Sequence, residues 1–347
     1  MGGEVARPAS VLVTGAAGFI GSRFVQSCAQ KGLAVVSVDK ASHFESRPEH
    51  KDIAFGRIVD RGDLFAWLDR EKPRLSGIVH LGACTDTTEL NEAYLTEINV
   101  EYSRKLWRYA TRERVPFVYA SSAATYGDGA HGYDDDEALI PRLKPLNPYG
   151  RSKQEFDLWA LAEERAGAAP PSWSGFKFFN VYGFGERHKG KMASVVLHAF
   201  DQIAERGTVR LFKSHRDDIP HGQQKRDFIH VADVLEVLHF ALAKPIRRGI
   251  LNIGTGCARS FLDLVRRVFA ELGRPERIDY IDTPVEIRSR YQYFTEAPIA
   301  RLRHEGYTAP FDSLETGVHL YIQDLLRGRS GGRDLSREDR SQGSVTA

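Results

Sequence analysis

Short apolar runs alternate with amphipathic stretches along the first half of this chain. Apolar, partly β-branched runs occupy residues 11–13, 34–38, 78–81, 117–120 and 175–180, and each predicts a buried strand. Residues 19–30, 90–112 and 152–165 have the apolar spacing of amphipathic helices. Strands that alternate with helices indicate a parallel sheet covered on both faces. We therefore expect an α/β fold, a Rossmann-type doubly wound parallel sheet.

The second half of the chain has a different pattern. Segments after residue 180 have longer loops, and residues 213–225 show no periodicity. We expect a dinucleotide-binding Rossmann domain over 9–180, with possible later returns to the sheet. Residues 181–326 are expected to form mainly a smaller α/β substrate-binding lobe. Residues 1–8 and 327–347 contain few apolar side chains and are predicted to be disordered tails.

Composition limits the function classes. The 347 residues carry a net charge of +2, which indicates neither a nucleic-acid nor a membrane partner. No apolar run approaches the ~20 residues of a membrane span, and the first eight residues do not resemble a secretory signal. Cys28, Cys84 and Cys257 have no metal-ligand spacing. We expect reduced thiols, a cytoplasmic location and no metal site.

A glycine-rich turn follows the first predicted strand. Gly15, Gly18 and Gly21 have the spacing G-x-x-G-x-x-G, with Phe19 and Ile20 opening the next helix. Small residues there let the backbone approach a pyrophosphate, which binds at the unpaired N–H groups of a helix N-terminus. The alternative is a tight turn without a ligand. The strand before it and the helix after it favour cofactor binding.

The residues after the second strand do not decide whether the cofactor carries a 2′-phosphate. Asp39 ends that strand, and an acid there typically accepts hydrogen bonds from the adenosine ribose of NAD. Lys40 and Arg61 are placed to meet the 2′-phosphate of NADP instead. Both cofactors remain possible from these residues, with NADP as the preferred interpretation and NAD as the alternative.

Three residues predict hydride chemistry. Tyr149 and Lys153 are four positions apart, on one face of a helix, so the ammonium is expected to lower the pKa of the phenol. Ser122 follows the strand at 117–120 and would orient a substrate oxygen towards Tyr149. A purely local hydrogen-bonding role for Ser122 is the alternative. The combination predicts a catalytic site.

This set resembles the extended short-chain dehydrogenase/reductase superfamily, whose members modify nucleotide sugars while holding NAD(P). The resemblance implies cofactor contacts from the strand end Leu81-Gly82-Ala83-Cys84-Thr85 and from Asn99. It adds Val181 to the glycines, Asp39, Tyr149 and Lys153 as a cofactor-contacting residue.

A second group of motifs is similar to the ADP-L-glycero-D-manno-heptose 6-epimerases. The motifs are Phe178-Phe-Asn-Val-Tyr-Gly183, Glu186-Arg-His-Lys-Gly190, Met192-Ala-Ser-Val195, Lys225-Arg-Asp-Phe228, Asn252-Ile-Gly-Thr-Gly256 and Arg290-Tyr-Gln-Tyr-Phe-Thr295. The resemblance runs from about residue 11 to 326. It implies an isomerase that oxidises and re-reduces the heptose of an ADP-heptose, for the inner core of lipopolysaccharide. It also implies a homo-oligomer, a pentamer in the family.

The same resemblance implies roles for individual residues. Lys189 would be a second acid/base, because the transient ketone must be reduced from its other face and a desolvated lysine can lose its proton. A surface lysine is the alternative, and Lys191 stands close enough to confuse the two. Substrate contacts are implied for Asn180, Lys191, His198, Phe212, Arg226 and Tyr291.

Two departures from the family pattern bear on the substrate. Lys191 replaces a usual serine, and the loop at 213–224 is longer than the family's short Gly-Ser loop. Another nucleotide-sugar epimerase or reductase of the superfamily is therefore the alternative. A 4,6-dehydratase is disfavoured because Ala123, Ala124 and Thr125 follow Ser122, where a dehydratase has acidic residues. A catalytically dead NAD(P)-binding scaffold protein is disfavoured by the intact Ser122, Tyr149 and Lys153.

Overall fold

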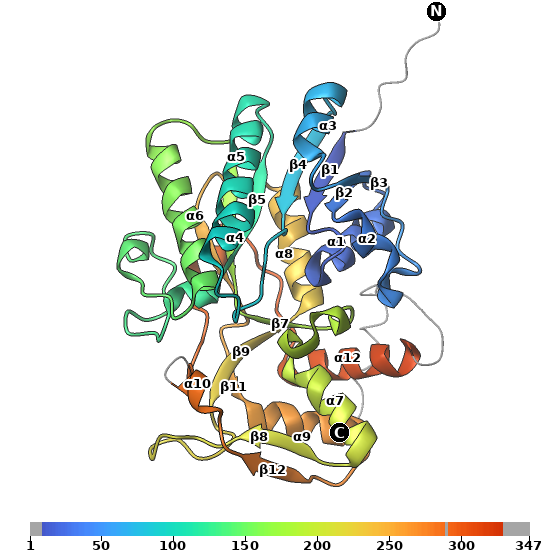
Figure 1. Ribbon diagram of the computed structural model, residues 1–347, viewed down its shortest axis with the longest axis vertical. Helices are drawn as coiled ribbons and strands as arrows, with labels where there is room; N and C mark the ends of the chain where they lie inside the picture. Colours follow the sequence, from blue (N-terminus) through green and yellow to red (C-terminus); the bar gives the residue numbers. More distant parts are fainter. Residues whose placement is uncertain (1–8, 289–290, 329–347) are drawn as a thin grey trace, which may run out of the picture.

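The computed structural model describes residues 9–288 and 291–328 of the chain. The protein is built around a seven-stranded parallel sheet of order β10-β6-β5-β4-β1-β2-β3 (Figure 1). The chain first adds strands on one side of β1 and then, from β4, on the other. Ligands of such sheets bind where the order reverses in this way. The strands are β1 (Ser10–Thr14), β2 (Val35–Asp39), β3 (Arg57–Asp60), β4 (Leu75–His80), β5 (Phe117–Ser122), β6 (Trp173–Phe178) and β10 (Ile250–Ile253).

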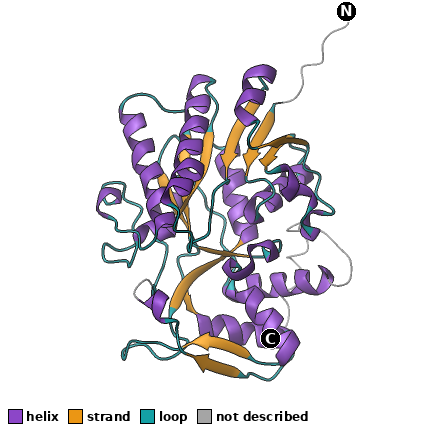
Figure 2. Ribbon diagram, in the orientation of Figure 1, coloured by secondary structure: helices purple, strands orange, loops and turns teal. Residues whose placement is uncertain are grey.

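Helices cover both faces of this sheet (Figure 2). Because neighbouring strand residues point to opposite faces, Val11 and Val13 belong to one buried cluster and Leu12 to the other. Both faces are apolar since both are covered, which explains the continuous apolar runs in the sequence. The elements around the sheet are α1 (Phe19–Gln30), α2 (Ala41–Glu45), η1 (Pro48–His50), α3 (Leu64–Glu71), α4 (Glu92–Leu95), η2 (Thr96–Glu101), α5 (Tyr102–Arg112), η3 (Ala123–Tyr126), η4 (Ile140–Arg142), α6 (Pro148–Arg165), α8 (Val231–Ala243) and α11 (Ala300–His304).

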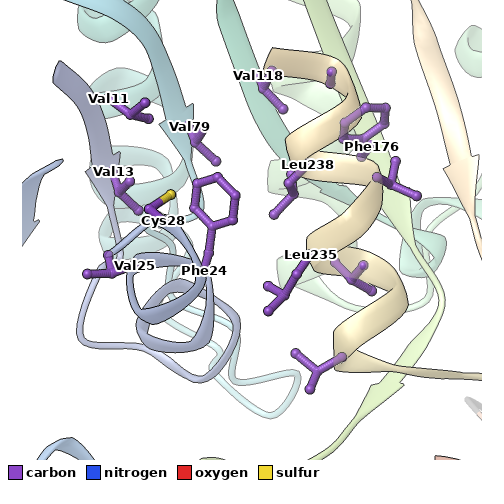
Figure 3. Close-up of a cluster of buried hydrophobic side chains, with 14 of the residues drawn as sticks. Val11, Val13, Phe24, Val25, Cys28, Val79, Val118, Phe176, Leu235 and Leu238 are labelled. Atoms are coloured by element: carbon purple, nitrogen blue, oxygen red, sulfur yellow. The ribbon is translucent and has the colours of Figure 1, made fainter. Parts of the chain in front are cut away.

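One face is packed by α1 and α8, which lie side by side on the sheet (Figure 3). Phe24 of α1 lies between the strand side chains and Leu235 and Leu238 of α8. Each of these side chains is at most 7 % exposed. Helix α8 belongs to the second half of the sequence, so the C-terminal part of the chain completes the core of the N-terminal part.

A smaller α/β lobe lies beyond the carboxyl ends of the strands (Figure 1). It has a three-stranded sheet of order β11-β9-β7 and a two-stranded sheet of β12 and β8. Its own buried cluster includes Phe200, Val265 and Tyr321. The elements are β7 (Asn180–Tyr182), η5 (Arg187–Met192), α7 (Val195–Arg206), β8 (Val209–Phe212), β9 (Lys225–His230), β11 (Ala258–Ser260), α9 (Phe261–Glu271), β12 (Ile278–Ile281), α10 (Val285–Arg288) and α12 (Leu314–Gly328).

The predicted fold class is confirmed, and β10 is a later return to the sheet. The division at residue 180 stays a prediction. Helix α12 includes Arg327 and Gly328, which were expected in the tail. The remaining tail residues, 1–8 and 329–347, lie outside the described residues. Within the described residues, none of the helices combines the length and apolar character needed to span a bilayer.

Candidate active site

A cavity of about 580 Å³ lies at the carboxyl ends of β1, β2, β4 and β5. This is the edge at which the strand order reverses, so the cavity occupies the position that the topology predicts for a ligand. Eighteen of the residues predicted from the sequence line it. They are Gly15, Gly18, Phe19, Ile20, Gly21, Asp39, Lys40, Arg61, Leu81, Gly82, Ala83, Cys84, Thr85, Ser122, Tyr149, Lys153, Val181 and Lys189.

The glycine-rich turn forms the floor of the cavity. Gly15 has φ +66°, and a Cβ there would lie 2.6 Å from the nitrogen of Gly82. A Cβ on Gly21 would overlap the carbonyl oxygen of Gly15. Helix α1 begins at Phe19, and its N-cap, Gly18, makes no side-chain capping bond. The turn therefore brings an uncapped helix N-terminus to the cavity, the arrangement that binds a pyrophosphate.

Asp39 is engaged by the protein itself. Its Oδ2 accepts a hydrogen bond from the Ala17 nitrogen at 3.1 Å, and its Oδ1 accepts one from the Lys40 nitrogen at 2.8 Å. His43 Nδ1 lies 3.1 Å from the same Oδ1. The carboxylate thus ties β2 to the glycine-rich turn in addition to facing the cavity.

Basic side chains surround this end of the cavity. Lys40 and Arg61 were predicted, and the structure adds His43 and Arg47. The Arg47 guanidinium donates to the carbonyl oxygen of Ala17 in the glycine-rich turn. Burial lowers the pKa of Arg47, and Asp39 opposes this shift. Sequence reasoning missed both added residues because His43 lies in the short helix α2 and Arg47 just after it, in a segment without a motif.

Ser122, Tyr149 and Lys153 meet on one wall of the cavity. Ser122 is the last residue of β5. The Asn147 side chain caps α6 by accepting a hydrogen bond from the Gly150 nitrogen at 2.8 Å, and Pro148 opens the helix. This cap fixes Tyr149 in the first turn and Lys153 one turn later. Lys153 Nζ donates to the Ala120 carbonyl oxygen at 2.9 Å.

Burial dominates the electrostatics of this wall. It raises the pKa of Tyr149, and a hydrogen bond with Ser122 partly offsets the rise. Burial also lowers the pKa of Lys153 to about 8, with Asp157 opposing it. The sequence-based prediction that the pKa of Tyr149 is lowered is therefore wrong for this structure. Desolvation of the phenol outweighs the favourable contacts of its phenolate.

Lys189 reaches the cavity from η5, in the smaller lobe. Its Nζ lies 3.4 Å from Oε2 of Glu186 and 5.2 Å from the ring centre of Phe19. Glu186 is fully buried, and it also accepts hydrogen bonds from the Ser194 nitrogen at 2.8 Å and the Ser194 Oγ at 2.5 Å. The sequence predicted a desolvated amine here, whereas the structure places a carboxylate beside Lys189 and leaves its side chain 24 % exposed.

Asn99 supports the cavity from behind. It is 1 % exposed, its Oδ1 accepts from the Cys84 nitrogen at 2.8 Å, and its Nδ2 donates to the Cys84 carbonyl oxygen at 3.0 Å. Nδ2 also lies 3.0 Å from the Ser152 Oγ. Asn99 thus links the segment after β4 to α6 but is not among the described residues that line the cavity. A direct cofactor contact stays a prediction.

The predicted substrate residues lie elsewhere. Among the residues described as lining the cavity, none of the six appears. Three of them gather in the smaller lobe, where the Arg226 guanidinium lies 5.5 Å from the ring centre of Tyr291, and Phe212 packs edge-on against Tyr291. Asn180 and Lys191 are exposed, and His198 is half-buried on α7.

Arg226 has an unusual environment for a cation. It is only 8 % exposed, and burial lowers its pKa. Its guanidinium donates to the carbonyl oxygens of Lys225 and Gln292 and lies over the ring of Phe261. A guanidinium held by backbone oxygens and aromatic rings keeps a charge that an anionic ligand can meet.

Comparison with known proteins agrees with this geometry. Residues 11–254 match the NAD dependent epimerase/dehydratase family. The ADP-L-glycero-D-manno-heptose-6-epimerase of Fusobacterium nucleatum subsp. nucleatum is 40% identical over 327 residues, covering 91% of this chain and 98% of the relative. The enzyme of that name from Nitratidesulfovibrio vulgaris (strain DP4) is 44% identical over 321 residues, covering 91% and 97%.

Solved structures are similar as well. The crystal structure of the Helicobacter pylori ADP-L-glycero-D-manno-heptose-6-epimerase superposes with a TM-score of 0.77 at 26% identity, covering 92% of this chain and 96% of that one. One assignment follows from the glycine-rich turn, from the wall formed by Ser122, Tyr149 and Lys153, and from these similarities. The chain belongs to the NAD dependent epimerase/dehydratase family and, within it, to the ADP-L-glycero-D-manno-heptose-6-epimerases.

Proposed function

We propose that this protein converts ADP-D-glycero-D-manno-heptose into ADP-L-glycero-D-manno-heptose by inverting C6 of the heptose, a step in making the inner core of lipopolysaccharide. It is an isomerase that depends on a nicotinamide cofactor. The observation that carries the proposal is one cavity lined both by the glycine-rich turn and by Ser122, Tyr149, Lys153 and Lys189. Family membership identifies the reaction type.

The cavity fits a nicotinamide dinucleotide. Gly15 and Gly21 leave no room for a Cβ, so the backbone stays open to a close ligand, and α1 offers its N-terminus. We favour NADP over NAD. Lys40, His43, Arg47 and Arg61 line the end of the cavity near Asp39, while Asp39 is already bonded to the Ala17 and Lys40 nitrogens. A 2′-phosphate would meet these basic side chains.

When bound, the cofactor supplies hydride acceptance from C6 and hydride return to it. In its ionised form, Tyr149 would take the proton of the C6 hydroxyl at its Oη, and Ser122 would orient that oxygen. Lys153 is held by the Ala120 carbonyl oxygen one helical turn from Tyr149, so its ammonium stabilises negative charge at the phenol. The buried wall excludes water, because Tyr149 and Lys153 are 8 % and 6 % exposed.

Inversion requires the ketone to be reduced on its second face, and a second group must return the proton to the same oxygen. Lys189 lines the cavity from a different element and carries an ammonium beside Glu186. We assign it as the acid/base for that face. In this role Lys189 donates a proton from Nζ to the C6 oxygen, and Glu186 holds the side chain near Phe19.

The diphosphate of the substrate is assigned to the smaller lobe. Arg226 presents a buried guanidinium between Phe261 and Tyr291, and guanidinium groups bind phosphates bidentately. Phe212 and Tyr291 would pack on the adenosine, while Asn180, Lys191 and His198 would contact the sugar. These roles, a cytoplasmic location and a pentameric assembly stay predictions.

The direct test is to incubate the purified protein with ADP-D-glycero-D-manno-heptose and to follow the C6 epimer by NMR. We expect conversion to an equilibrium mixture without added cofactor, if the cofactor co-purifies, or with added NADP. Turnover of a UDP- or GDP-sugar together with none of the ADP-heptose would overturn the substrate assignment. No turnover of any nucleotide sugar by cofactor-loaded protein would overturn the catalytic one.

A further inference from the structure

A fully buried ion pair lies behind the catalytic wall. Lys177 of β6 and Asp157 of α6 are both 0 % exposed, and Lys177 Nζ lies 2.9 Å from the Asp157 Oδ2. Two charges are costly to remove from water, and apolar residues of the same volume often stabilise a core equally well. Stability alone therefore does not account for this pair.

The pair contacts the end of β5 that carries Ser122. Tyr119 Oη and Ser121 Oγ donate to the Asp157 carboxylate at 2.9 and 2.7 Å. Lys177 is directly opposite Ser121 in the β5–β6 register. Each strand residue from 119 to 121 that points towards α6 is thus tied to Asp157, because residues two apart share a face of the sheet.

Lys177 reaches the backbone of Ser122 through one intermediate. Its Nζ donates to the Thr125 Oγ1 at 2.6 Å, and the Thr125 Oγ1 donates to the Ser122 carbonyl oxygen at 2.8 Å. Thr125 is fully buried. Lys177 also lies 5.1 Å from the ring centre of Tyr126, in the same short helix η3 as Thr125.

Asp157 also lies on the helix face of the catalytic residues. Tyr149, Lys153 and Asp157 are successive positions four apart on α6. The ionisable groups that face Lys153 are Asp157 and Tyr149 from α6, His80 from β4 and Cys84 from the segment after β4. Burial lowers the pKa of His80 to about 3, so it is neutral. Asp157 therefore supplies the negative charge near Lys153.

We propose that the Asp157–Lys177 pair is a positioning device for the catalytic wall: it fixes the Ser121–Ser122 end of β5 and provides the counter-charge to Lys153. The inference rests on the proposed roles of Ser122, Tyr149 and Lys153. Asp157 and Lys177 do not line the cavity formed by the described residues, so they act through their neighbours.

The charge part of the proposal, that Asp157 is the counter-charge to Lys153, is tested by titrating Lys153 directly. In full-length, cofactor-free protein labelled at lysine Cε, the Lys153 signal is assigned by its loss in Lys153→Met. Burial sets the pKa of Lys153 to about 8 against the opposing effect of Asp157. Asp157→Asn removes that opposition, so the midpoint is expected to fall, by about 0.5–1 pH unit.

Tyr119→Phe is the matched control. It removes one hydrogen bond from the same carboxylate but leaves its charge, so the Lys153 midpoint should stay at the wild-type value. If Asp157→Asn does not fold, Asp157→Asn/Lys177→Met removes both buried charges and should show a smaller fall, because the loss of the Lys177 cation offsets part of the loss of the Asp157 anion. A wild-type midpoint in folded Asp157→Asn, or a midpoint at or above the wild-type value in the double variant, would overturn the charge part.

The positioning part is tested with Thr125→Val, which breaks the link from Lys177 to Ser122 without changing a charge. We expect kcat to fall about tenfold with KM and the Lys153 midpoint unchanged, because Ser122 loses its fixed position. A wild-type kcat in Thr125→Val would overturn the positioning part. If neither the wild type nor any variant were active on ADP-heptose, the proposed function would fail. The titration would still show whether Asp157 is the counter-charge to Lys153, because it needs no activity.

Discussion

Tyr149 and Lys153 stand on the eighteen-residue helix α6, whereas Lys189 stands on η5, a segment of six residues. The first pair is buried, is fixed by the Asn147 cap and lies against β5. Lys189 is partly exposed, and the next residue, Gly190, has φ +53°. One proposed acid/base is therefore part of the sheet domain, and the other is carried by an irregular segment of the smaller lobe.

The two regions also differ in the partners of their lysine side chains. Lys153 is bonded to a backbone carbonyl, and Asp157, the carboxylate that opposes the fall in its pKa, is engaged by Lys177. Lys189 faces the buried carboxylate of Glu186 directly. Burial thus dominates the pKa values of Tyr149 and Lys153, whereas the position of Lys189 is set beside a carboxylate.

Removal of the Tyr149 hydroxyl should have the largest effect, since both directions of the proposed reaction use it. Tyr149→Phe is expected to lower kcat about 10³-fold, within the range for loss of a general acid/base. The ring remains, so bound cofactor and the melting temperature should be unchanged. The NMR assay measures kcat, cofactor fluorescence measures the bound cofactor, and thermal unfolding gives the melting temperature. Less than a tenfold loss of kcat would mean that another group accepts the proton.

Lys189→Met should have the next largest effect, about a 10²-fold lower kcat for epimerisation. Because Tyr149 stays intact, the substrate should still be oxidised, and reduced nicotinamide should be visible by its absorbance after substrate is added. Lys191→Met is the comparison, since Lys191 is exposed and two residues away. It should alter KM and leave kcat within about threefold. Wild-type turnover by Lys189→Met would refute the two-base scheme.

The sequence predicted the first region far better than the second. A strand, a glycine-rich turn and a helix are local patterns, and a four-residue spacing places Tyr149 and Lys153 on one face whatever surrounds them. Val59 is the single buried residue of β3, an edge strand, so that strand carried no apolar run to detect. The raised pKa of Tyr149 could not be read from spacing, because it results from desolvation by distant segments.

The second region depends on contacts that no periodicity encodes. Glu186 stands only three residues before Lys189, yet its burial beneath α7 and α12 is a tertiary property. Likewise, Arg226, Phe212 and Tyr291 come from separate segments and meet only in the folded lobe. Resemblance to a family named these residues, and residue patterns alone did not.

The cavity that both regions line offers a third test. Arg47 donates to the glycine-rich turn and stands among the basic residues near Asp39. Arg47→Met is expected to weaken NADP binding about tenfold and to change NAD binding less than threefold, because only NADP carries the 2′-phosphate. Titration of cofactor-free protein with each nucleotide measures both. Equal losses for the two cofactors would instead place Arg47 at the pyrophosphate.

The smallest effect is expected at Glu186, and it addresses the comparison most directly. Glu186→Gln keeps the side-chain shape and an oxygen for the Ser194 nitrogen, but it removes the charge facing Lys189. A partly exposed pair at 3.4 Å contributes at most about 1 kcal/mol, so kcat should fall about fivefold with KM unchanged. Ser194→Ala is the control, because it removes a hydrogen bond to Glu186 and the α7 cap while leaving the carboxylate charged. It should lower the melting temperature with little effect on kcat. If both variants turn over at the same rate, the ion pair does not position Lys189, and the two regions would differ in burial alone.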